Sequence, residues 1–183
     1  VYSEKYSPSF ALIEKLESQE GIYWQVTHSD NSKRIYGKNP QSRIANPDHP
    51  HQIYKWLLHS QTDAKGNIVL YHYDKFGGTN TYLTAVEYGN YTLNNKTSFA
   101  YKVIIDYGQV QFDVNINERT FTSDVVAQRK PSLRSDVQSH YRAGFLIKTE
   151  YLIRNIFVYH HFCADVSCTN FPGTLSGFTF RMA

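Results

Sequence analysis

The chain has 183 residues, a formal net charge of +3 and two cysteines, Cys163 and Cys168. This weak positive charge predicts no nucleic-acid partner. No apolar run approaches the ~20 residues that a membrane-spanning helix needs, so we expect no membrane insertion by this segment. Two cysteines do not form a disulfide framework. Aromatic residues make up 15% of the chain and 15 residues are tyrosine, which favours pleated sheet.

The first candidate strands lie in the N-terminal third of the chain. The segments "GIYWQVTH" (Gly21–His28) and "QIYKWLLHSQT" (Gln52–Thr62) are rich in β-branched and aromatic residues. Between them, "NPDHP" (Asn46–Pro50) predicts a rigid loop, because each proline fixes its own φ and keeps the preceding residue out of the helical region.

Two turns enclose the next strand, in the stretch "TDAKGNIVLYHYDKFGG" (residues 62–78). Asp63–Asn67 predicts one turn, Ile68–Tyr73 the strand, and Asp74–Gly78 the second turn. Asparagine and glycine at such turns permit a positive φ, and the alternating tyrosines suit a strand that covers its neighbour.

The clearest alternation is in "FAYKVIIDYG", whose one face carries Phe99, Tyr101, Val103, Ile105 and Tyr107. Period two over nine residues predicts a strand with one buried face. This strand is followed by Gly108, and the segments at Tyr36–Gly37 and Tyr88–Gly89 also reach a Tyr-Gly pair. We therefore expect three strands that end in the same way.

The second half of the chain is harder to interpret. Residues 115–140 are polar and charged, which predicts a long internal loop, with a short helical turn at 135–140 as an option. The apolar segment "GFLIKTEYLIRNIFVYHHF" (Gly144–Phe162) predicts one long or bent strand, with a helix as the alternative because of its length. The predicted fold class is all-β, with antiparallel strands and hairpins in a meander.

One cluster, "VYHHFCADVSC", has residue types that bind metals. Adjacent histidines on a strand point to opposite faces, so only His161 could share a face with Cys163; these two are weak metal candidates. A strand end without metal is the favoured interpretation. His49 and His51 beside Asp48 fit a surface turn better than an acid–base pair. No Ser-His-Asp order, Gly-x-Ser-x-Gly, His-Glu-x-x-His or phosphate-binding loop occurs in the sequence, so we predict no catalytic activity and no cofactor.

The order of these motifs resembles the SpvB-type domain of the B components of Tc (toxin complex) toxins, from about Phe10 to Tyr107 and from Tyr141 to Phe162. The first motif block of the family consists of a Trp-x-Val strand, an Ile-Tyr-Gly turn, an Ala-Arg-Ile-Ala-Asp-Pro loop, a Trp-Leu-Leu strand, and an Asp-x-x-Gly-Asn turn into Tyr-x-Tyr. The second motif block is a later Tyr-Arg-x-Gly-Phe stretch that leads to His-His-Phe. The matching residues, which form the candidate structural motif, are Trp24, Tyr36, Gly37, Arg43, Pro47, Trp56, Asp63, Gly66, Asn67, Tyr71, Tyr73, Tyr141, Arg142, Gly144, Phe145, His160, His161 and Phe162.

This resemblance implies a structural role. The stretch from Asp63 to Tyr73 is similar to the YD repeats of RHS proteins, whose turns join the strands of a hollow β-shell. In the family, the B and C components form a shell around the toxic part of C, and a propeller of B docks on the pore-forming A component. ADP-ribosyltransferase activity belongs to a separate C-terminal domain of some SpvB proteins. Two departures from the pattern are Asn46, where an Asp is usual, and Cys163–Asn170, which replaces the usual turn.

We therefore interpret residues 1–183 as one SpvB-type β domain, a fragment of a larger toxin chain, since it starts at Val1 and ends on the strand-like "GFTFRMA". The resemblance implies protein partners: other parts of the B chain, a C component and a pore-forming A component. It also implies assembly in the bacterial cytoplasm followed by secretion. Two alternatives stay open: a free-standing, aromatic-rich module that binds a glycan or a protein, and a metal enzyme that uses the histidines.

Overall fold

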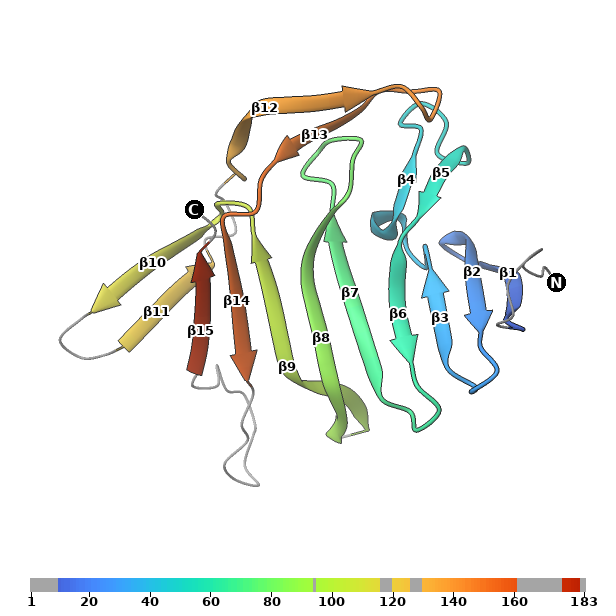
Figure 1. Ribbon diagram of the computed structural model, residues 1–183, viewed down its shortest axis with the longest axis horizontal. Helices are drawn as coiled ribbons and strands as arrows, with labels where there is room; N and C mark the ends of the chain where they lie inside the picture. Colours follow the sequence, from blue (N-terminus) through green and yellow to red (C-terminus); the bar gives the residue numbers. More distant parts are fainter. Residues whose placement is uncertain (1–9, 94, 116–119, 126–129, 161–175, 182–183) are drawn as a thin grey trace.

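The computed structural model describes residues 10–93, 95–115, 120–125, 130–160 and 176–181. Its main element is one antiparallel sheet of nine strands, which Figure 1 shows nearly face on. The strands in their spatial order are β1 (Leu12–Ser18), β2 (Gly21–Thr27), β3 (Lys33–Tyr36), β6 (Leu58–Thr62), β7 (Ile68–Asp74), β8 (Tyr82–Leu93), β9 (Lys96–Asp106), β14 (Asn155–His160) and β15 (Ser176–Arg181).

Three two-stranded ribbons accompany this sheet. They are β4 (Arg43–Ala45) with β5 (Ile53–Trp56), β10 (Val110–Asn115) with β11 (Thr120–Val125), and β12 (Leu133–His140) with β13 (Ile147–Tyr151). Figure 1 shows β12 and β13 running across the upper ends of the sheet strands, towards β4 and β5. The helical content of the described residues is a single 3-10 turn, η1 (Pro40–Ser42), and these residues include no helix that could span a membrane.

The predicted all-β, antiparallel fold class is confirmed. The alternation that begins at Phe99 corresponds to β9, which pairs with β8 on one side and β14 on the other. The turn–strand–turn prediction for residues 62–78 is confirmed as well, with β7 between two turns.

The predicted loop over residues 115–140 is wrong in the part of that range that the structure describes. β11 pairs with β10, and β12 pairs with β13. Seven of the eight residues of β12 are exposed to solvent. A strand that is solvated on both faces has polar residues on both faces, so it lacks the alternation by which a half-buried strand is recognised.

Three strand boundaries also differ from the prediction. Leu57 separates β5 from β6, because its N–H donates to Ser42 O at 2.8 Å and its carbonyl accepts from Gly37 N at 2.8 Å. Leu152–Arg154 separates β13 from β14, and Arg154 N donates to Asp106 O at 2.8 Å. The strand expected to end at Gly89 continues to Leu93 as β8. Tertiary hydrogen bonds, which no local pattern encodes, decide the first two of these boundaries.

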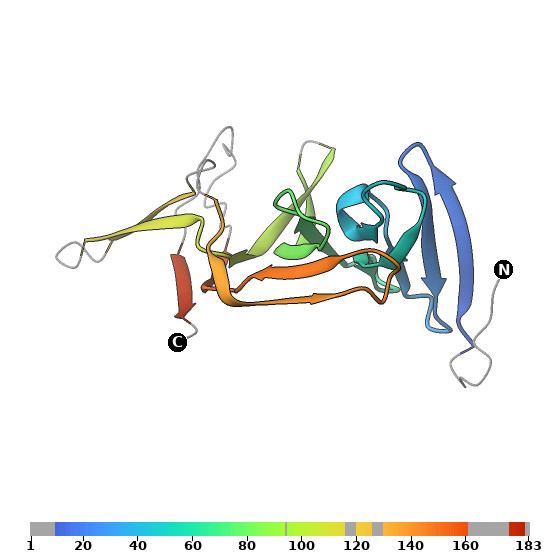
Figure 2. The ribbon, with the colours of Figure 1, turned by 90° about the horizontal axis from the view of Figure 1, so that it is seen from above.

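An aromatic cluster fixes the β12–β13 ribbon to the sheet. Phe76, Tyr82, Tyr107 and Tyr151 pack with ring centroids 5.2 to 5.7 Å apart. The Tyr82 hydroxyl accepts from Glu150 N at 2.9 Å. Tyr82 and Tyr107 belong to the small set of buried hydrophobic residues, which among the described positions comprises Ala11, Ile44, Tyr82, Ala85, Tyr107, Ile147 and Phe157. Most residues of the sheet are half-buried, and the ribbon runs alongside the sheet, as the view from above in Figure 2 shows.

Candidate interaction site

Arg43 is the most deeply buried charged residue of the motif, with 7% of its surface exposed. Its Nε donates to Gly37 O at 2.6 Å and its Nη1 to Glu20 O at 2.6 Å, while Nη2 reaches Lys38 O at 3.3 Å. Burial lowers the pKa of Arg43, and the nearby Glu20 opposes this effect. An arginine keeps its charge under such conditions. The guanidinium therefore ties the β1–β2 turn to the end of β3.

The aromatic residues of the first motif block pack around this arginine. Trp24 lies opposite Tyr36 in the β2–β3 pair, and the rings of Trp24 and Trp56 meet edge to face with centroids 6.0 Å apart. The Trp56 side chain also occupies the position that a Cβ on Gly37 would take, and Gly37 has a φ of +65°. Only glycine satisfies both constraints at position 37. The structure thus places Trp24, Tyr36, Gly37, Arg43 and Trp56 together.

The "NPDHP" loop is held by its own side chains. The Asn46 carbonyl oxygen Oδ1 accepts from Asp48 N at 3.0 Å, and Asn46 Nδ2 donates to Gln52 Oε1 at 3.0 Å. Asn46 therefore orders the loop without a salt bridge. His49 and His51 are exposed, with ring centroids 5.8 Å apart. This agrees with the interpretation of the segment as a surface turn.

The stretch that carries the Asp-x-x-Gly-Asn motif is a self-contained turn. Asp63 Oδ1 accepts from Lys65 N at 2.8 Å and from Asn67 N at 2.9 Å, and Asp63 Oδ2 accepts from Asn67 Nδ2 at 2.6 Å. The hydrogen bond from Asn67 is the main reason why the pKa of Asp63 is lowered. Asn90 joins this turn to β8, since its Oδ1 accepts from Ile68 N at 2.6 Å.

The two tyrosines of the Tyr-x-Tyr motif stand on β7. The Tyr73 hydroxyl donates to Leu58 O at 2.7 Å, and burial raises the pKa of Tyr73 to about 12. Tyr71 is half-buried on the same strand. Both residues therefore belong to the large sheet.

The second motif block forms the turn of the β12–β13 ribbon. Gly144 N donates to Tyr141 O at 3.0 Å, while Tyr141 and Arg142 are exposed. The Phe145 ring meets the Tyr54 ring edge to face, with centroids 6.5 Å apart. Through this contact the ribbon reaches β5, which belongs to the first motif block.

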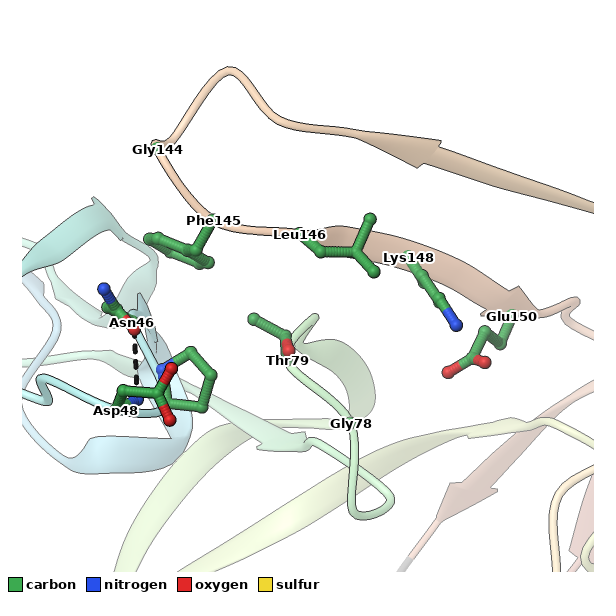
Figure 3. Close-up of a pocket in the computed structure, with 10 residues that line it drawn as sticks. Asn46, Asp48, Gly78, Thr79, Gly144, Phe145, Leu146, Lys148 and Glu150 are labelled. Carbon is green, nitrogen blue, oxygen red and sulfur yellow. Dashed lines mark hydrogen bonds between the residues drawn. The ribbon is translucent and has the colours of Figure 1, made fainter.

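Both blocks line a cleft of about 510 Å³ (Figure 3). Its walls come from the β4–β5 loop, the β7–β8 turn, the β12–β13 turn and β13. Its lining residues are Asn46, Pro47, Asp48, Gly78, Thr79, Gly144, Phe145, Leu146, Lys148 and Glu150. Figure 3 shows Asp48 towards one end of the cleft, and Lys148 and Glu150 towards the other. The cleft offers an aromatic wall and charges of both signs.

Two groups of polar side chains were not predicted from the sequence. Glu87 accepts from His72 Nε2 at 2.8 Å and forms an ion pair with Lys102 Nζ at 2.9 Å. Burial acts to raise the pKa of Glu87, but these two partners lower it. Asp106, 1% exposed, accepts from Gly108 N, Gln109 N and Asn155 Nδ2. The contacts of Glu87 with His72 and Lys102, and that of Asp106 with Asn155, lie across strands, so only the register could have revealed them.

The predicted metal candidates are not tested. His161 and Cys163, together with Phe162 and Cys168, lie outside the described residues, and His160 ends β14 opposite Tyr101 of β9. Within the described ranges, no group of three or more His, Cys, Asp and Glu residues could hold a metal ion. The absence of metal at the His-His-Phe end stays a prediction.

These observations define an antiparallel β scaffold whose motif residues order turns and join neighbouring strands. The family described as "Salmonella virulence plasmid 65kDa B protein", SpvB, matches residues 1–80 and 74–162. The chain belongs to this family.

Relatives and solved structures agree with this assignment. A mono(ADP-ribosyl)transferase SpvB of Salmonella typhimurium (strain 14028s / SGSC 2262) is 24% identical over 165 residues, which cover 76% of this chain and 27% of that protein. The N-terminal domain of the effector protein SpvB from Salmonella typhimurium strain LT2 has a TM-score of 0.73 at 18% identity, covering 99% of this chain and 68% of that one. The chain thus corresponds to about a quarter of the length of the curated relative.

Two toxin-complex structures share the fold. The crystal structure of TcdB2-TccC3 without its hypervariable C-terminal region has a TM-score of 0.76 at 24% identity, covering 95% of this chain and 9% of that one. The Photorhabdus luminescens Tc holotoxin pore has a TM-score of 0.72 at 25% identity, with 91% and 9% covered. In both, the matching region is a small part of a much longer chain.

Proposed function

We propose that this chain is a non-catalytic structural and interaction domain of a Tc-like insecticidal or virulence toxin, and that it helps to form the β-shell of a B component around the toxic part. The observation that carries the proposal is the set of hydrogen bonds that the motif residues form with the backbone. Arg43 and Tyr73 donate to backbone carbonyls of neighbouring segments, and Asp63 accepts from backbone N–H groups of its own turn. Such residues stabilise a β scaffold, and their polar groups are not free to react with a substrate.

The extended sheet supports the same role. Few hydrophobic residues are buried at the described positions, and most sheet residues are half-buried. Apolar surface that stays half-exposed is available to further protein. The proposed partners are other parts of a toxin B chain, a Tc C component and a pore-forming A component. In this proposal the assembly forms in the bacterial cytoplasm and is then secreted.

A domain exchange tests the proposal. This chain replaces the corresponding segment of a toxin-complex B component, which is then co-expressed with its C component. We expect a shell that protects the toxic part of C from added protease. A matched chimera that carries Arg43→Ala should fail to assemble. A chimera that folds and yet leaves the toxic part open to protease would contradict the shell function.

The cleft favours one second candidate, a free-standing module that binds a glycan or a protein through Phe145 and its polar neighbours. The discriminating measurement is binding of the purified chain to a glycan array, compared with Phe145→Ala. Binding that is lost in Phe145→Ala at unchanged stability would support the module. Protection of the toxic part in the chimera, without any glycan binding, would support the scaffold.

A further inference from the structure

The join between β3 and β6 contains an extra residue. Ile35 lies opposite Ser60, but the next pair matches Tyr36 with Leu58, so His59 has no partner on β3. This is a β-bulge, where a strand bends and its ladder is locally interrupted. The join is also one of the places where the sheet order skips strands of the sequence, since β4 and β5 form a separate ribbon.

The environment of the His59 ring favours its neutral form over its protonated form. The side chain is half-buried, and its Nδ1 is a buried atom without a hydrogen-bond partner. In a neutral imidazole, one nitrogen can be an acceptor that receives no hydrogen bond, at a moderate cost in free energy. In the protonated ring both nitrogens are donors, and a buried donor without an acceptor is costly.

The charged and titratable groups around His59 come from each neighbouring element. Burial is the largest cause that lowers the pKa of His59; repulsion from His72 of β7 and from Lys38 adds to it, and Glu20 opposes it. Lys38 is fixed with its ammonium 3.7 Å from the centre of the Tyr23 ring. Tyr73 stays neutral in the relevant range, because burial raises its pKa to about 12. Burial is thus the main cause of the lowered pKa, and the nearby positive charge of Lys38 acts in the same direction.

Arg43 adds a further fixed charge to this corner of the fold. Its guanidinium binds the backbone carbonyls of Glu20 and Lys38, two of the three residues whose side-chain charges act on His59. His72 in turn is paired with Glu87 at 2.8 Å. These contacts order the backbone around Glu20 and Lys38 and the side chain of His72.

We propose that the β3–β6 join is an acid-sensitive latch, which is closed while His59 is neutral and opens when His59 takes up a proton. Opening would free β1, β2 and β3 from the rest of the sheet. The direction follows from linkage. The folded state holds the His59 pKa below the unfolded value of about 6.5, so the join has its full stability above that pH and loses it progressively as the pH falls below it.

Hydrogen exchange of the 183-residue chain tests the latch. Amides of β3 and β6 are compared at pH 7.5 and pH 5.5, after correction for intrinsic exchange rates. We expect opening to be faster at pH 5.5 than at pH 7.5 by up to about tenfold, because pH 5.5 lies about one unit below the unfolded pKa, while β8 and β9 stay protected. In His59→Gln, which keeps polarity but cannot titrate, the acid effect should disappear. The control His49→Gln changes an exposed loop histidine and should behave like the wild type.

The latch is wrong if β3 and β6 open no faster in acid, or if wild type and His59→Gln respond equally. A second measurement does not depend on the variant. The His59 ring of the wild-type chain is titrated by NMR, and a midpoint clearly below 6.5 would support the proposal. A midpoint at about 6.5 or above would overturn it.

Discussion

Arg43 shows how one side chain can hold several segments. Its three donor atoms reach carbonyls of Glu20, Gly37 and Lys38. In most proteins a buried arginine faces a carboxylate. Here the acceptors are backbone groups that have lost their solvent. The residue therefore contributes to stability mainly through donors that no other residue type can supply in that geometry.

Replacing Arg43 with lysine should be strongly destabilising. A lysine ammonium cannot reach three diverging carbonyls, and buried polar groups left without partners cost about 1 to 3 kcal/mol each. We expect the free energy of unfolding to fall by about 3 kcal/mol, measured by urea denaturation. The matched control is Arg142→Lys, since Arg142 is exposed in the second motif block. It should change stability by less than about 0.5 kcal/mol. Equal effects would contradict the role of Arg43.

Substitutions at Gly66 measure backbone strain separately from side-chain contacts. Its φ is +86°, and an added Cβ would meet no atom within 4 Å. Any penalty at this position therefore comes from the backbone alone. Gly66→Val should destabilise the fold by roughly 1 to 2 kcal/mol, and Gly66→Asn by less, because asparagine tolerates positive φ. Lys65→Ala, at an exposed position, should be nearly neutral. The measurement is thermal unfolding of the three variants. A Gly66→Val variant that melts like the wild type would refute the claim that the backbone at position 66 requires glycine.

At the scale of elements, the β12–β13 ribbon depends on Tyr82. Its hydroxyl accepts from Glu150 N and donates to Lys148 O, which joins β8 to β13. Tyr82→Phe keeps the ring in the aromatic cluster but removes both bonds. We expect a loss of about 1 to 3 kcal/mol and faster hydrogen exchange at Glu150. Tyr91→Phe is the control, because Tyr91 is 38% exposed on the same strand. Unchanged exchange at Glu150 would contradict this account.

The elements differ in how far the sequence could predict them. β7 and β9 were predictable, since alternation and turn residues are local features. β12 was missed because its solvated faces carry no alternation. The division of Gln52–Thr62 at Leu57 was also missed, because hydrogen bonds to Ser42 and Gly37 cause it. The motif residues were found through family resemblance, whereas the His72–Glu87–Lys102 group required the register.

At the scale of the whole molecule, the proposed function predicts no enzymatic activity. The purified chain should not transfer ADP-ribose from NAD to actin or to proteins of a cell lysate. The physical reason is that Arg43, Asp63 and Tyr73 of the motif are engaged in backbone hydrogen bonds. An active mono(ADP-ribosyl)transferase is the positive control in the same labelling assay. Labelling above background by the pure chain, lost after its heat denaturation, would refute the prediction.

The order of strands in the large sheet has a consequence for how the chain folds. All joins but two link strands that follow one another in the sequence; the exceptions are β3–β6 and β9–β14. Strands joined to their sequence neighbours can pair early, because the short loops between them close at little entropic cost. During synthesis, most strands would find a partner as soon as the next one leaves the ribosome. β9 has to wait for the last part of the chain, so its free edge is the surface that a nascent chain must protect.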